Sequence, residues 1–254
     1  MLVDSDRALA SALLTLPEVI AVSLGGSRAL GTDDEASDTD LYAWYRGTPP
    51  PAEARGAALR PLADGVIHSS DLFGPEDHFA VAGRLTEVVH LDLDALTEQA
   101  RVARTEGLGG DVCATAFLHT AFAGIVVADP SGALGRFQAD LAHYPEATRE
   151  RQLRDLPQLA DEYASQLTKA QLRGDWPMVV RRRAALVDVL ASVVFAVNRR
   201  YHPGEKRLLA HLAAAPVRPD DLTGRLETAC LAPAEDLELA PLLVGLIGET
   251  VALG

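Results

Sequence analysis

The stretch "SLGGSRALGTDDEASDTDLYAWY", residues 23–45, decides the fold of the first half of the chain. It begins inside an apolar run, residues 19–24, that is typical of a buried strand. A second run suited to a strand covers residues 39–45, with Asp38 and Asp40 at its start. Because side chains two residues apart on a strand point to the same face, these carboxylates are expected to project together. They repel each other unless a cation lies between them, and Mg²⁺ binds through one or two carboxylates together with substrate phosphates.

The turn between the two runs is suited to an anion. Glycine lets the backbone approach a ligand closely, and free N–H groups at the start of a short helix, expected over residues 27–30, can bind a phosphate. The sequence therefore predicts a phosphate-binding end beside the metal-binding end, formed by Gly25, Gly26, Ser27 and Arg28.

Length and composition are those of an ordinary globular protein. The chain has 254 residues, of which 48% are hydrophobic and 23% charged, enough for one large domain or two modest ones. The apolar runs are shorter than the roughly 20 residues that span a bilayer, and the first residues lack the positive charge of a secretory signal. The two cysteines, Cys113 and Cys230, have no metal-site spacing. We expect a cytoplasmic protein with no membrane partner.

Charge is distributed unevenly along the chain. The net charge is −13, and residues 1–144 hold 9 Arg against 21 Asp and Glu, a balance of −12. Nucleic-acid binding needs clustered Lys and Arg, so a nucleic-acid partner is not expected. An acidic half instead attracts divalent cations and cationic small molecules.

The hydrophobic period changes near residue 144. The first part mixes short apolar runs with helical segments, whereas the second part has the three- and four-residue spacing of amphipathic helices. We expect strands at residues 19–24, 39–45, 65–69, 87–93 and 124–128, early helices at 5–14 and 52–60, long helices at 146–173 and 177–198, and three shorter ones at 204–214, 219–230 and 235–252.

The segment "GGSRALGTDDEASDTDLY", residues 25–42, resembles the signature of the polymerase-β-type nucleotidyltransferases, in which Gly-Gly/Ser and Asp-x-Asp lie about ten residues apart. It is especially similar to the bacterial small-molecule branch, which includes the aminoglycoside and lincosamide nucleotidyltransferases. Three weaker stretches agree: "VVHLDL" (88–93), "VVADPSG" (126–132) and "FAVNRRYHPGEKRLL" (195–209). The resemblance implies an α/β plus all-α protein, with a nucleotidyltransferase catalytic domain built on a mixed β-sheet, residues 1–143, and a helical bundle, residues 144–254, that binds substrate or nucleotide.

The resemblance also implies an activity. A nucleoside monophosphate, expected to be AMP from ATP, is transferred to an acceptor hydroxyl with two Mg²⁺ ions. Asp38 and Asp40 are the implied metal ligands, and Asp92 is the implied third carboxylate, either a ligand of the second ion or the base, with Asp94 as its alternative. The only two lysines of the sequence, Lys169 and Lys206, fall where the resembling enzymes place phosphate-binding cations.

The enzyme class that the resemblance implies and the negative charge of residues 1–144 together favour a cationic, aminoglycoside-like acceptor. Such an acceptor implies a role in antibiotic resistance. Two alternatives stay open at this point. One is a protein-directed, AMP-transferring antitoxin-type enzyme, although such enzymes are usually shorter than this chain. The other is a regulatory or binding module that keeps the fold without chemistry.

Overall fold

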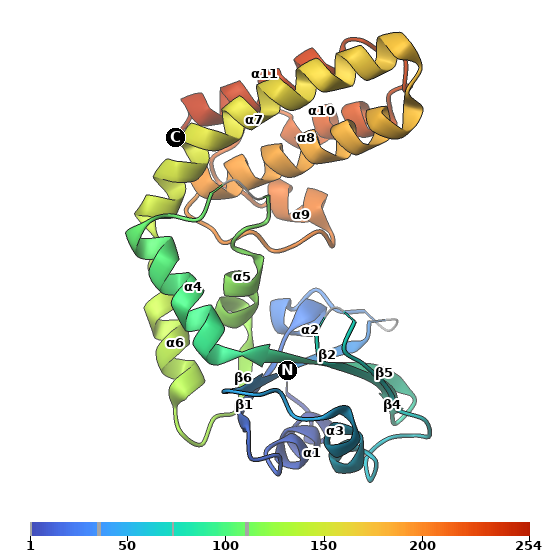
Figure 1. Ribbon diagram of the computed structural model, residues 1–254, viewed down its shortest axis with the longest axis vertical. Helices are drawn as coiled ribbons and strands as arrows, with labels where there is room; N and C mark the ends of the chain where they lie inside the picture. Colours follow the sequence, from blue (N-terminus) through green and yellow to red (C-terminus); the bar gives the residue numbers. More distant parts are fainter. Residues whose placement is uncertain (1, 35–36, 73, 110–111) are drawn as a thin grey trace. The chain divides into compact units, whose positions relative to one another are not determined.

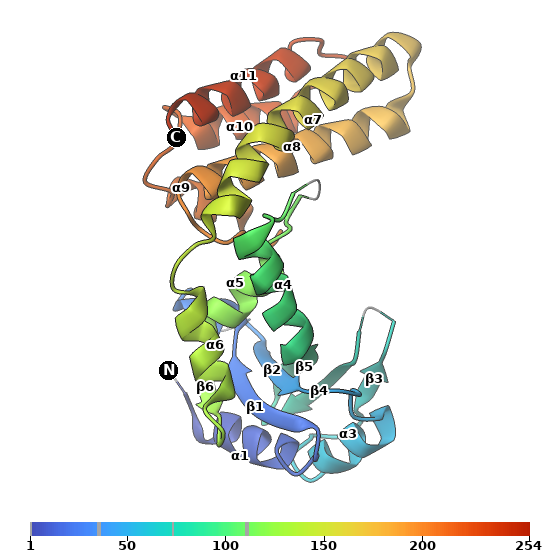
Figure 2. The same cartoon turned by 60° about the vertical axis from the view of Figure 1, so that its left-hand side comes forward.

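The structure is a computed structural model that describes residues 2–34, 37–72, 74–109 and 112–254. The chain forms two compact units, shown in Figures 1 and 2. The first unit comprises residues 1–100 and 120–143, and the second comprises residues 101–119 and 144–254. One division thus falls next to the expected boundary at residue 143, while the segment 101–119 belongs with the helical part. The functional roles of the two predicted domains stay predictions.

The first unit is built on a six-stranded sheet with the order β3-β4-β5-β2-β1-β6. Strands β2 and β5 are parallel, and each other neighbouring pair is antiparallel, so the sheet is mixed, as predicted. The strands are β1 (Val19–Leu24), β2 (Thr39–Tyr45), β3 (His68–Ser70), β4 (Glu76–Val81), β5 (Arg84–Asp92) and β6 (Ile125–Ala128).

Two helices cover one face of this sheet, α1 (Asp4–Leu13) and α3 (Ala52–Leu59), which lie below it in Figure 1. Every second side chain of the central strands enters the core on this side, because successive residues of a strand point to opposite faces. The core includes Leu9, Leu13, Val22, Leu24, Leu41, Leu59, Phe79 and Val88. The other face of β2 therefore carries the intervening residues, among them Asp40 and Tyr42.

The bounds of β1 and β2 are those expected from the sequence, whereas the region from residue 65 to 93 differs. β3 begins at His68 rather than residue 65, and β5 begins at Arg84 rather than residue 87. β4 was not expected, because its Glu76, Asp77 and His78 interrupt the apolar alternation by which a half-buried strand is recognised.

Further helices of the chain are α2 (Gly26–Leu30), α4 (Leu93–Thr105), α5 (Ala116–Ala123) and α6 (Ala133–Leu141), followed by α7 (Glu146–Arg173), α8 (Trp176–Val197), α9 (Leu208–Ala213), α10 (Leu222–Leu231) and α11 (Leu239–Ala252). The expected long helices agree with α7 and α8 to within one residue. α7 ends at Gly174, which takes a left-handed conformation with φ 68°, and the Asp175 side chain caps the start of α8.

The core of the second unit lies among α7, α8, α10 and α11. It includes the buried face of α8, formed by Val179, Leu186, Val189, Leu190, Val193 and Val197. The helical C-terminal part predicted from the sequence is thus confirmed. Within the described ranges, the model contains no helix of the length and apolarity that crossing a membrane requires.

Candidate functional site

Asp38 and Asp40 stand at the start of β2, on the sheet face opposite α1 and α3. Asp38 is the residue before the strand, Asp40 is its second residue, and both are half-buried. Thr39 between them is buried on the other face, where its hydroxyl accepts a hydrogen bond from Arg28 Nη1 at 3.1 Å. The alternation of the strand therefore places the two carboxylates on one side of the sheet.

The glycine turn touches this pair directly. A Cβ atom added to Gly26 would overlap the Asp40 carboxylate, and one added to Gly25 would overlap the Tyr42 ring. Gly26 also has φ +57°, which favours glycine. The Gly25 N–H donates to the Asp40 carbonyl oxygen at 2.8 Å. The two glycines are thus required by the close approach of β2, and Asp40 lies against the first residue of α2.

The carboxylate that faces Asp40 across the sheet is Glu87. In the parallel pairing of β2 and β5, Asp40 is aligned with Glu87, and partners in a ladder point to the same face. Tyr42 gives independent support, because burial, followed by the charges of Asp40 and Glu87, raises the pKa of its hydroxyl to about 12. Both carboxylates therefore lie near one side chain on this face, and Glu87 completes a group of three with Asp38 and Asp40.

The structure does not bring Asp92 to this group. Asp92 is aligned with Tyr45, five residues along β2 from Asp40 or roughly 16 Å at the usual rise per residue. Asp92 is also an odd number of residues from Glu87 in β5, so its side chain points to the other face of the sheet. Its Oδ1 accepts hydrogen bonds from the N–H groups of Asp94 at 2.9 Å and Ala95 at 3.2 Å. Asp92 therefore caps the start of α4, and the expected position of Asp92 beside Asp38 and Asp40 is corrected, because Glu87 is the carboxylate aligned with Asp40.

The alternative, Asp94, is equally remote from the site. It lies in the first turn of α4, where acidic residues suit the helix dipole. Its carboxylate forms an exposed ion pair with Arg46 at 3.1 Å. Neither Asp92 nor Asp94 is available as a third ligand beside Asp38 and Asp40.

Arg28 is bound to Asp6 rather than directed at a phosphate. Its Nη1 and Nη2 atoms donate to the two carboxylate oxygens of Asp6, each at 2.8 Å, and both side chains are buried. The hydrogen bond to Asp6 is the main cause that raises the pKa of Arg28. This bidentate pair joins α2 to α1, and although the charge of Asp40 also acts on Arg28, the hydrogen bonds of its guanidinium to Asp6 and Thr39 give no support for the expected phosphate contact.

The remaining predicted residues lie in two places. Ser27 follows Gly26 in α2. Lys169 belongs to α7 and Lys206 to the segment before α9, and both side chains are exposed within the second unit. Their expected contact with a triphosphate stays a prediction.

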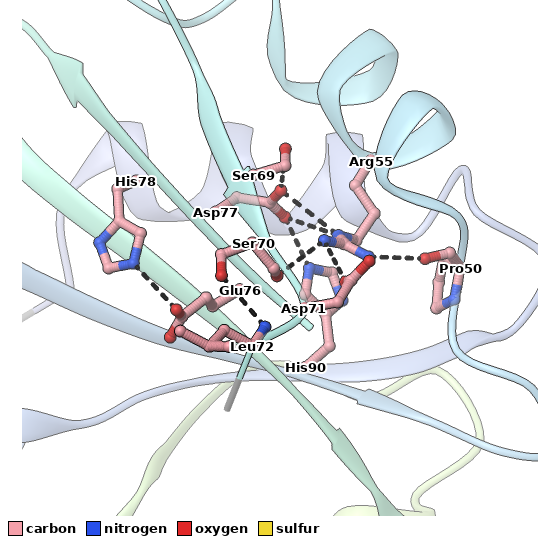
Figure 3. Close-up of polar contacts among 10 residues, drawn as sticks. All are labelled: Pro50, Arg55, Ser69, Ser70, Asp71, Leu72, Glu76, Asp77, His78 and His90. Atoms are coloured by element: carbon pink, nitrogen blue, oxygen red, sulfur yellow. Dashed lines mark hydrogen bonds and ion pairs between the residues drawn. The ribbon is translucent and has the colours of Figure 1, made fainter. Parts of the chain in front are cut away.

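A buried charged network that the sequence did not reveal lies on the α3 side of the sheet, opposite the face that carries Asp38, Asp40 and Glu87 (Figure 3). Asp77 of β4 accepts from Arg55 Nε at 3.1 Å, from Ser69 Oγ at 2.6 Å, and pairs with His90 Nε2 at 2.9 Å. Arg55, Asp77 and His90 are each at most 2% exposed. Arg55 also donates to the Pro50 carbonyl oxygen and to Asp71. The network ties α3, β3, β4 and β5 together under the site.

Comparisons with known proteins give limited similarity. The family model described as "Domain of unknown function (DUF4037)" matches residues 112–208, which is less than half of the chain. The comparison with curated proteins found no match. Among solved structures, the chain is similar to the crystal structure of a nucleotidyltransferase-like protein from Exiguobacterium sibiricum 255-15, with a TM-score of 0.48 and 12% identity over 98% of this chain and 73% of that chain. A match at this level carries no statement about activity, substrate or metal.

Proposed function

We propose that this protein is a Mg²⁺-dependent nucleotidyltransferase that moves a nucleoside monophosphate, AMP from ATP, to a hydroxyl group of a small molecule. The observation that carries the proposal is that Asp38, Asp40 and Glu87 occupy neighbouring positions on one face of the sheet. Asp40 lies against Gly26 and is aligned with Glu87. Three half-buried carboxylates at neighbouring positions repel one another, and a structure keeps such a group where a cation offsets the charge.

The donor set fits Mg²⁺. The three side chains offer only carboxylate oxygens, which are the ligands a hard cation prefers. When bound, two such ions would supply charge stabilisation for the attacking and leaving oxygens of the phosphoryl transfer. Asp38 and Asp40 would hold the ions, and Glu87 would complete the set or accept the proton of the acceptor hydroxyl.

The glycine turn has its own role in this proposal. Gly25 and Gly26 let the turn pack directly against Tyr42 and Asp40, so the backbone at the start of α2 lies next to a carboxylate that would hold the metal ion of a metal–triphosphate. The Ser27 hydroxyl and backbone N–H groups would donate to phosphate oxygens.

Replacing Glu87 tests the third carboxylate. We expect Glu87→Gln to lower the rate of transfer at least about 100-fold, the usual scale for the loss of a general base. Asp92→Ala is the matched comparison, because it removes a carboxylate from the same strand. It should keep transfer and lose about 0.5–2 kcal/mol of stability as α4 loses its cap. The measurements are single-turnover transfer and the free energy of unfolding. Transfer that depends on Asp92 and not on Glu87 would contradict the assignment.

We propose that the acceptor is cationic, of the aminoglycoside-like class. The first part of the chain carries a balance of −12 over residues 1–144, and a bound triphosphate adds further negative charge to that of the carboxylates. A polyamine sugar gains both association rate and affinity from such a field, whereas a neutral or anionic acceptor gains nothing.

The acceptor class is tested with Mg²⁺, labelled ATP and a panel of antibiotics, by looking for nucleotidyl adducts. We expect adducts with cationic members of the panel. With Mg²⁺ and a non-hydrolysable nucleotide, those members should also raise the melting temperature, by a shift that decreases as salt increases through about 0.1–1 M. Adducts and shifts confined to uncharged lincosamide-type or protein acceptors, and insensitive to salt, would overturn the acceptor class and leave the transfer reaction in place.

A further inference from the structure

The carboxylate group continues across the sheet as a row of polar side chains. In the antiparallel pairing of β4 and β5, Glu87 is aligned with His78, and in that of β3 and β4, His78 is aligned with His68. With Asp40 aligned to Glu87 on the other side, four strands place His68, His78, Glu87 and Asp40 in one line on one face. Directly aligned partners have Cβ atoms about 4.5–5.5 Å apart, which is within reach of a shared ligand.

Three side chains at the β4 end of this row already converge. The Nε2 atom of His78 lies 3.7 Å from Glu76 Oε1 and 3.9 Å from Glu87 Oε1. One ligand atom from each residue lies within 4.8 Å of the other two. Figure 3 shows Glu76 and His78 side by side on the face of β4 opposite Asp77. The separations are longer than hydrogen bonds and have the length of ion pairs, which a protonated imidazole would form with the two carboxylates.

These distances suit a metal ion. Ligand atoms about 2.0–2.2 Å from Zn²⁺ at tetrahedral angles lie about 3.3–3.6 Å apart. Each separation between two ligand atoms therefore needs to shorten by between a fraction of an ångström and somewhat more than one ångström. The side chains are 21%, 47% and 27% exposed for Glu76, His78 and Glu87, so they can adjust and solvent can complete the coordination shell.

We propose that Glu76, His78 and Glu87 form a second metal site, for a borderline divalent cation such as Zn²⁺. The imidazole decides the class of ion, because nitrogen ligands suit Zn²⁺, Co²⁺ and related metals, whereas Mg²⁺ prefers oxygen. The charge also agrees, since two carboxylates and a neutral imidazole balance a dication. His68 is aligned with His78 in the next strand and exposed, which makes it the candidate for a fourth ligand.

This site shares Glu87 with the proposed Mg²⁺ group. A side chain in the middle of the row can turn toward His78 or toward Asp40, and it does not serve both ions fully at once. We therefore expect Zn²⁺ at the second site to antagonise Mg²⁺-dependent transfer, a consequence that rests on the proposed function. The binding of the borderline ion does not rest on it.

The test is a titration of the whole protein with Co²⁺, a coloured substitute for Zn²⁺, without Mg²⁺ and again in millimolar Mg²⁺, which should weaken Co²⁺ binding if the two sites share Glu87. The visible absorption of bound Co²⁺ and calorimetry report binding without any activity assay. Loss of a direct ligand should cost more than the 10–100-fold typical of an outer-shell partner, so His78→Ala and Glu76→Gln should each weaken Co²⁺ binding more than about 100-fold. His143→Ala, an exposed histidine outside the sheet, is the matched control and should bind as the wild type does.

Asp40→Asn separates the two proposals. It should retain Co²⁺ binding within a few-fold while losing transfer. Binding that His78→Ala leaves unchanged, or that Asp40→Asn removes as completely as His78→Ala, would overturn the second site. Co²⁺ binding that depends on His78 in a protein without transferase activity would instead support the site and contradict only the proposed function.

Discussion

Asp38→Asn and Asp40→Asn are each expected to lower nucleotidyl transfer by at least about 10³-fold. A metal ion at this position contributes several kcal/mol of charge stabilisation in the transition state, and each 1.36 kcal/mol corresponds to a factor of ten in rate. The amide keeps the size of the carboxylate but not its charge, so Mg²⁺-dependent nucleotide binding should weaken together with transfer.

The fold should survive these substitutions, because removing one of several neighbouring negative charges relieves repulsion in the metal-free protein. We expect a melting temperature that is unchanged or raised. The matched control is Asp33→Asn, which makes the same change of charge at an exposed position of the connection between α2 and β2 and should transfer at the wild-type rate. Transfer that persists in both Asp38→Asn and Asp40→Asn would exclude the proposed metal group.

The parts of the site that could be predicted are those set by local sequence. β1 and β2 are short apolar runs with clear ends, and the glycines between them fit only a close approach of the backbone. Asp38 and Asp40 belong to the same strand, so the two-residue period alone places them on one face. No information about distant pairing is needed for any of these statements.

The third carboxylate could not be found in this way, because its choice depends on the pairing of two strands far apart in the chain. In "VVHLDL" the acidic residue is Asp92. Nothing in that stretch says which alternate side chains of the strand lie on the same face of the sheet as Asp40. The register of β2 with β5 decides it, aligning Asp40 with Glu87 and Tyr45 with Asp92. A shift of one residue would reverse every side chain of β5.

The burial and pairing of Arg28, which was expected to contact phosphate, and of Asp77 could not be predicted for a related reason. A charged residue in a sequence is expected at the surface, since burial of a charge is costly unless it is paired. The partner of Arg28 is Asp6 and the partners of Asp77 are Arg55 and His90, all contributed by other elements. Only the tertiary structure shows that these charges are paired and buried.

The network around Asp77 gives the largest expected effect on stability. Asp77→Asn should lower the free energy of unfolding by about 3–5 kcal/mol, the usual cost of removing one partner of a buried ion pair. Arg55, 1% exposed, would keep its charge without the carboxylate that balances it. Its contact with Asp71 does not compensate, because that side chain is 63% exposed. Chemical denaturation of the two proteins at neutral pH measures the difference.

The same pair predicts how stability depends on pH. Burial by itself would raise the pKa of Asp77, but hydrogen bonds from His90 and Ser69 and the charge of Arg55 together hold the pKa below its usual value. A carboxyl group whose pKa is lower in the folded state stabilises the fold above its unfolded pKa, about 3.9, and loses this contribution as pH falls through the folded pKa. The wild type should therefore lose stability below about pH 4 more steeply than Asp77→Asn.

Asp71→Asn is the matched control for this prediction, because it also removes a carboxylate from Arg55 but at the surface. An exposed pair contributes about 0–1 kcal/mol, so this variant should unfold almost as the wild type does.

If the network also supports the residues on the opposite face of β4, Asp77→Asn should weaken Co²⁺ binding by Glu76 and His78, which flank Asp77 in β4. Asp71→Asn should not weaken it. Equal stability of Asp77→Asn and Asp71→Asn would show that the buried charges are not coupled, and that β4 is held to β5 by its backbone ladder alone.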